Sequence, residues 1–194
     1  MRSSTYCRYD CARGFVSARC GGQPDYSGWR REAIVMKSLE TVIAEVEESA
    51  RNDHPDVLKR ATDLVTEFPT EAQVWSLRAY IHERAGDILA AIDDVSRAMS
   101  LSPREPSHYF DRGRYRLKLG DSAGAISDFD DGIQISNLHG DDYYLESLYF
   151  VRAEALVRVG RSREALTDLT HVRDDFVLWT TELQTKESLL SKFR

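Results

Sequence analysis

The sequence has few cysteines and prolines and lacks a long apolar run. All three cysteines lie within the first twenty residues, so disulfides do not hold the body of the chain, which suits a reducing compartment. No run of about 18 apolar residues occurs, so we expect no membrane span. The first residues also lack the apolar core of a secretory signal. Together these absences favour a cytoplasmic protein.

Sequence motifs for enzymatic chemistry are also missing. The sequence has five histidines but no H-E-x-x-H, because Gly86 stands where the second histidine would follow His82-Glu83. It contains no Gly-x-Ser-x-Gly, and the stretch from Gly120 to Gly124 lacks the lysine of a phosphate-binding loop. We therefore expect no enzyme, no cofactor and no metal. A less favoured alternative is an enzyme or metal site at residues 139–142, although two or three ligands in one loop do not complete a site.

Charge divides the chain into two parts. Residues 1–35 carry six arginines and three acids, a net charge of +3, whereas residues 36–194 carry 20 basic and 29 acidic residues, a net charge of −9. An acidic body argues against a nucleic-acid backbone as partner and suits a basic protein.

Residues 1–35 show no periodic apolar pattern and contain Gly21-Gly22-Gln23-Pro24. We expect a disordered basic tail. Three alternatives stay open: an organelle transit peptide, a chain that starts at Met36, and a zinc site at Cys7, Cys11 and Cys20, which lacks paired spacing and a fourth ligand.

A pattern repeats every 34 residues. The segments Trp75–Pro103 and Tyr109–Asn137 align, with Gly86 and Gly120, and Ala91 and Ala125, each 34 residues apart. A period in this range, built of helix pairs, predicts a helical solenoid.

This repeat resembles the tetratricopeptide repeat. The family places a large residue early in the first helix and a small one a turn later, as in Trp75/Ala79, Tyr109/Gly113 and Tyr149/Ala153. It places Gly-Asp at the turn, which matches Gly86-Asp87 and Gly120-Asp121, and Ala early in the second helix, which matches Ala91, Ala125 and Ala165. The last repeat departs from the pattern, because Arg161 follows its turn glycine and Val172 replaces a small residue.

The resemblance implies an all-α fold, a right-handed α-α superhelix of about four helix-turn-helix repeats over residues 36–194. The expected repeats span 36–70, 71–104, 105–138 and 143–177, the first of them degenerate, with a C-terminal cap at 178–194. Gly120 and Gly160 are 40 residues apart, so we place a six-residue insertion at 137–142. A stack leaves an apolar face bare at each end, and Phe176 to Trp179 are predicted to cover the last one. Thr185 is predicted to cap a short helix.

One charge pattern recurs that the core does not require. We predict three ion pairs that bridge the two helices of a repeat: Arg78 with Asp94, Arg112 with Asp128, and Arg152 with Asp168. The alternative is a ladder of arginines that binds an acidic ligand.

In proteins of this family the first helices line a concave side that holds a peptide or a partner's helix. By resemblance, the partner-binding residues here are Tyr80, Arg84, Phe110, Arg114, Leu117, Lys118, Phe150 and Glu154. The alternative is that the three aromatic residues among them pack between adjacent helices.

The predicted function is therefore protein–protein interaction, adaptor or chaperone-like, with an extended peptide or helix of another protein as partner. Nucleic acid and membrane are not expected as partners. The Lys and Asn clamp that holds heat-shock chaperone carboxylates is absent, since Ser76, Tyr80 and Asp111 stand at its positions. The alternative function is a self-associating structural scaffold.

Overall fold

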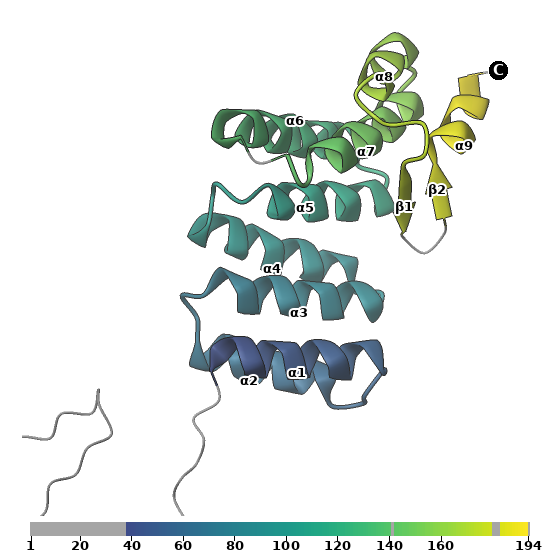
Figure 1. Cartoon of the computed structure of the whole chain (residues 1–194). Helices are drawn as coiled ribbons and strands as arrows, with labels where there is room; N and C mark the ends of the chain where they lie inside the picture. The colour runs from purple at the N-terminus through teal and green to yellow at the C-terminus, as the bar shows by residue number, and fades with distance from the viewer. Residues whose placement is uncertain (1–37, 141, 180–182, 194) are drawn as a thin grey trace, which may run out of the picture. The chain divides into compact units, whose positions relative to one another are not determined.

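The computed structural model describes residues 38–140, 142–179 and 183–193, and this part of the chain forms four antiparallel helix pairs followed by a C-terminal extension (Figure 1). The pairs are α1 (Leu39–Arg51) with α2 (Val57–Glu67), α3 (Ala72–Arg84) with α4 (Ile88–Leu101), α5 (Pro106–Lys118) with α6 (Ser122–His139), and α7 (Leu145–Arg158) with α8 (Ser162–Leu169). The predicted tail, the alternative start and the three cysteines lie outside the described residues. No helix in the described part is both long and apolar enough to cross a membrane.

Local sequence explains where the helices begin and end. The side chains of Asp87 and Asp121 accept hydrogen bonds from backbone N–H groups three residues on, which caps α4 and α6. Gly86 and Gly120 precede them with φ of 82° and 84°, a left-handed conformation that glycine adopts without a steric penalty. The Gly-Asp turns of the repeat therefore have a direct physical role.

Each helix packs against the next along the chain, and the first helices also contact one another. Small residues permit the close approach of the two helices in a pair: Gly113 faces Phe129, and Ala91, Ala125 and Ala165 are fully buried. The apolar stripes of successive pairs thereby form an all-α solenoid.

The three predicted ion pairs are present in this packing. In each, a guanidinium nitrogen lies 2.6 Å from a carboxylate oxygen. The three carboxylates, Asp94, Asp128 and Asp168, are buried at 4%, 1% and 4% exposure. Buried carboxylates need such partners, because removing an unpaired charge from water costs on the order of several kcal/mol. Each pair thus links the two helices of its repeat.

The predicted insertion does not begin as a loop. Helix α6 continues through Asn137 to His139 and ends at Gly140, whose φ is 67°. Ser136 is buried on this extra turn, whereas residues 137–140 are exposed. The described residues hold no group of three or more His, Cys, Asp or Glu that could bind a metal, and Asp141 lies outside them.

The C-terminal extension contains two short strands that the sequence pattern did not predict. Strand β1 (Val177–Trp179) pairs antiparallel with β2 (Leu183–Thr185), with Val177 opposite Thr185. Thr185 then caps α9 (Lys186–Leu190) through a capping box, as predicted. A short 3₁₀ turn, Ser191–Phe193, follows. Phe176 and Leu189 are buried on the last helix pair, whereas Val177 is 41% exposed and does not cover it. The side chain of Trp179 is outside the description.

We predict that Gly113→Ala lowers the free energy of unfolding by about 1–3 kcal/mol, the usual cost of overpacking. A Cβ atom at position 113 would lie 2.2 Å from a ring carbon of Phe129. Urea unfolding of Gly113→Ala, Phe129→Leu and the double variant measures the effect. The double variant should be more stable than the sum of the single effects implies, and strict additivity would contradict the steric explanation.

We also predict that Arg78→Leu destabilises the protein more than Arg112→Leu. Among the described residues, loss of Arg78 leaves buried Asp94 with His82 at 3.8 Å as its ion-pair partner, and this should cost roughly 3–5 kcal/mol. Loss of Arg112 leaves Asp128 with Arg116 at 2.9 Å. Thermal unfolding at pH 8 compares the variants. Arg78→Leu/Asp94→Leu should recover much of the loss, and equal costs for the two single variants would contradict the backup role of Arg116.

Candidate functional site

A groove of about 810 Å³ lies across the first helices of the first three repeats. We call it the α1–α3–α5 groove. Its lining residues come from α1 (Glu40, Ile43, Ala44, Glu47, Arg51), from α3 (Ala72, Gln73, Ser76, Leu77, Tyr80), from the α4–α5 turn and α5 (Ser102, Glu105, Ser107, His108, Asp111), and from Tyr144 before α7. The predicted concave side is therefore hollow at this end of the stack.

The rest of the concave side is filled by the protein's own side chains. The ring of Tyr144 lies 5.6 Å from that of Phe110, and Phe176 from the C-terminal extension lies 5.2 Å from Phe150. The Arg158 side chain crosses from α7 to donate a hydrogen bond to the backbone carbonyl of Leu117 at 3.0 Å. The space between the C-terminal half of α5 and α7 is thus crossed by the protein's own side chains.

Four of the eight predicted partner-binding residues are buried: Phe110 (7% exposed), Leu117 (6%), Phe150 (1%) and Glu154 (8%). They are therefore not exposed contact residues in this structure. Tyr144 packs on Phe110, Phe176 packs on Phe150, and Arg158 pairs with Glu154. The alternative, that the aromatic residues pack inside the molecule, describes Phe110 and Phe150.

Three more of the predicted residues are held in ion pairs. Arg84 pairs with Asp53 in the α1–α2 turn, and Arg114 and Lys118 reach Glu83 at 3.3 Å and 2.5 Å. The eighth predicted residue, Tyr80, lines the groove. It is half-buried and packs against the apolar core that α1, α2 and α3 share. The Arg84 guanidinium lies 5.9 Å from the centre of its ring.

His108 lies on the floor of the groove with 6% exposure. Its Nδ1 lies 3.3 Å from the hydroxyl of Ser76 on α3, while its Nε2 has no hydrogen-bond partner among the described residues. Burial lowers the pKa of the imidazole, so it is neutral at pH 7. The groove floor therefore contains a neutral imidazole ring whose Nε2 atom has no hydrogen-bond partner among the described residues.

Asp111 lies three residues further along α5, on the same helix face. Its side chain is 34% exposed, so its desolvation in the groove is partial, and this partial desolvation raises the pKa of its carboxyl group to about 6. Arg114, 3.8 Å away, opposes this shift, and Glu83 adds to it. Asp111 is thus ionised at pH 7 in an unfavourable setting.

The ionisable lining of the groove is mainly acidic. Its carboxylates are Glu40, Glu47, Glu105 and Asp111, and its one guanidinium in the described residues is Arg51, which lies 2.9 Å from Glu48. Apolar and aromatic surface from Ile43, Leu77, Tyr80 and Tyr144 lies between these charges. Such a surface can hold a segment that carries both apolar and basic side chains.

Sequence reasoning missed most of this lining. It treated the first repeat as degenerate and assigned no binding residue to it, although α1 supplies Glu40, Ile43 and Glu47. The helical apolar stripe of 36–50 could have placed these residues opposite α3. No signal in the repeat pattern points to Tyr144, because it follows the insertion.

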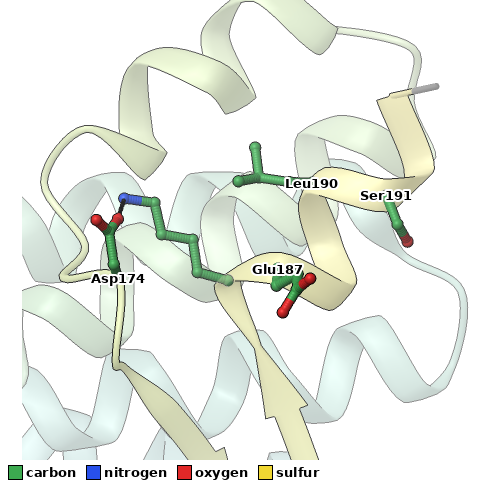
Figure 2. A pocket seen from close by; sticks show the side chains of 5 residues that line it. Asp174, Glu187, Leu190 and Ser191 are labelled. Carbon is green, nitrogen blue, oxygen red and sulfur yellow. Dashed lines mark hydrogen bonds and ion pairs between the residues drawn. The ribbon is translucent and has the colours of Figure 1, made fainter.

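A smaller hollow of about 330 Å³ lies in the C-terminal extension, lined by Asp174, Lys186, Glu187, Leu190 and Ser191. Figure 2 shows Asp174 on the loop after α8 and the other labelled residues on and after α9. The Lys186 ammonium donates to Asp174 at 2.8 Å and to the carbonyl of Val172 at 2.7 Å. This lysine already joins the extension to the α8 loop, so the hollow is structural.

We predict that Asp111→Asn stabilises the folded protein at pH 7.5. Folding raises the pKa of the Asp111 carboxyl group from about 4 to about 6, so the folded protein binds this proton more tightly than the unfolded chain does. Above pH 6 the group is ionised in both states, and its charge then lowers the free energy of unfolding. The stability advantage of the variant should shrink as the pH falls from about 6 toward 4. Urea unfolding at several pH values measures it, and a variant less stable than wild type at pH 7.5 would contradict this electrostatic account.

Comparisons with known proteins support a fold of stacked helix pairs. No protein-family model matches the chain. An 86-residue segment is 29% identical to Tetratricopeptide repeat protein 36 of Danio rerio and covers 44% of this chain. The match covers 40% of that relative, so the chain spans less than half of its length.

Two solved structures share the fold. MamA matches with a TM-score of 0.61 and 19% identity, over 69% of this chain and 75% of MamA. The Yersinia enterocolitica type III secretion chaperone SycD, solved in complex with a peptide of the translocator YopD, matches with a TM-score of 0.56 and 15% identity, over 64% of this chain and 94% of SycD. The stacked helix pairs and these similarities together show that the chain has an all-α superhelical fold similar to that of tetratricopeptide repeat proteins.

Proposed function

We propose that the α1–α3–α5 groove binds an extended segment of a partner protein, and that the chain acts as an adaptor or a chaperone-like module. The observation that carries this proposal is the groove itself, which stays open while the neighbouring concave surface over α7 is filled. This proposal assigns the groove a binding role and no catalytic step.

The extent and lining of the groove support a peptide. Its volume of about 810 Å³ is open to an occupant, and its lining comes from three helices and the segment before α7. Three parallel walls contribute to it, and exposed side chains such as Ala44 and Gln73 lie along them. A chain segment can lie across several helices in such a site, whereas a small molecule would contact only a part of it.

Two aromatic residues offer anchoring positions. Tyr80 from α3 and Tyr144 from the segment before α7 both line the groove, and each is half-buried, with part of its ring still accessible. Aromatic side chains of this kind carry much of the binding energy at protein interfaces. The structural neighbour SycD, whose structure contains a translocator peptide, supports the same manner of binding.

The test uses two variants with the same substitution. Gln73→Trp fills the groove, and Gln134→Trp places the same side chain on an exposed position of α6 outside it. We expect a protein captured from host extract by the wild type, and then purified, to bind Gln73→Trp at least tenfold more weakly, equivalent to about 1.4 kcal/mol. Its affinity for Gln134→Trp should be unchanged. Isothermal titration calorimetry measures both affinities.

Circular dichroism and thermal unfolding check that both variants remain folded. A photo-reactive phenylalanine analogue at position 73 should crosslink to the partner, and one at position 134 should not. Equal affinity of the partner for the two tryptophan variants, with crosslinks at position 134 alone, would reject the groove as the binding site.

A further inference from the structure

Asp111 lines the groove and has a long ion pair as its cation contact among the described residues. Its nearest guanidinium, that of Arg114, lies 3.8 Å away and is also drawn to Glu83 at 3.3 Å. Further along α5, Lys118 is 2.5 Å from Glu83 and Arg116 is 2.9 Å from Asp128. Arg114 is therefore shared between Glu83 and Asp111, and the charge on Asp111 is only partly balanced.

The rim of the groove carries further acids that face the same space. Glu40 and Glu47 come from α1, and Glu105 lies just before α5. Arg51 opposes them from the end of α1, but it is 4.0 Å from Glu47 and 2.9 Å from Glu48. A positive segment that approaches the groove would meet a negative potential along both walls.

A second feature of the floor also points to an occupant. His108 is 6% exposed, lines the groove beside Asp111, and has an Nε2 atom without a hydrogen-bond partner in the described structure. Buried polar atoms are normally paired, so an orphan at a groove floor requires an explanation. Nε2 of His108 accepts a hydrogen bond if Nδ1 donates to Ser76, and donates one if Nδ1 accepts from Ser76. The ionised carboxylate of Asp111, three residues along the same helix, is an acceptor and suits an occupant that brings hydrogen-bond donors.

From these contacts we infer that the groove selects a basic segment, in which one lysine or arginine side chain pairs with Asp111. Lysine and arginine are the side chains that combine positive charge with several donors and no acceptor. Pairing would balance the carboxylate where the protein's own cations do not. This inference rests on the proposed function and adds the chemical class of the bound segment.

The test uses two libraries of ten-residue peptides, randomised except at two central positions, which are fixed as lysine in one library and as glutamate in the other. Each is passed over the immobilised full chain at pH 7.5. We expect the lysine library to be retained at least tenfold more than the glutamate library. Asp111→Asn should reduce this preference several-fold, whereas Asp63→Asn, the same substitution on an exposed position of α2, should leave it unchanged.

Lowering the pH provides a second readout. Because the pKa of Asp111 is about 6, retention of the lysine library should fall between pH 7.5 and pH 5 in the wild type, and much less in Asp111→Asn. Glu40, Glu47, Glu83, Glu105, His108, Arg51 and Arg114 face the same space, and they are present in both proteins. Their titration therefore cancels in the comparison.

The outcomes separate this inference from the proposed function. Preferential retention of the glutamate library, or a lysine preference that Asp111→Asn leaves intact, overturns the inference. If retention of either library is still lost in Gln73→Trp and kept in Gln134→Trp, the groove binds peptides and only the charge selection fails. Failure to retain any peptide contradicts both the inference and the proposed function.

Discussion

An amphipathic helix pair cannot bury its own apolar stripe, and most features of this protein follow from that constraint. Each pair is covered by the next, with small residues such as Gly113 allowing the helices to approach and buried Arg–Asp pairs linking them. The last pair has no further repeat to cover it. Phe176 and Leu189 of the C-terminal extension pack there instead, and they close the α7 end of the concave side. The requirement to end the stack therefore also determines which part of the groove remains open.

The open part contains an electrostatic cost that a bound partner could remove. Asp111 is ionised at neutral pH although its surroundings raise its pKa to about 6, and His108 beside it leaves one polar atom unpaired. Neither feature benefits the isolated fold, because both groups would be more stable if they were paired. Residues that disfavour folding and line a groove are commonly retained for binding. The same carboxylate thus connects the stability of the fold to the proposed recognition of a basic segment.

The sequence predicted the fold well because the 34-residue period encodes local contacts. Gly86-Asp87 and Gly120-Asp121 specify turns and caps, and the recurring Arg78/Asp94 spacing anticipates an ion pair that the structure contains. The site was predicted less well. Phe110 and Phe150 match contact positions of the family, but Tyr144 and Phe176, which cover them, lie outside the repeat pattern. A period describes contacts between neighbouring repeats and carries no information on segments that interrupt or follow them. For the same reason the strands β1 and β2, three residues each, went unpredicted.

The most direct test of this account is a methyl NMR titration of the full chain with a lysine-containing peptide selected by the groove. The account predicts the largest shift changes at Ile43, Ala44 and Leu77, which line the α1–α3–α5 groove, and little change at Val157 on α7 or Leu190 on α9. Changes confined to Val157 and Leu190 would contradict it. They would place the binding surface at the C-terminal end of the stack, where the structure has packed the protein's own extension.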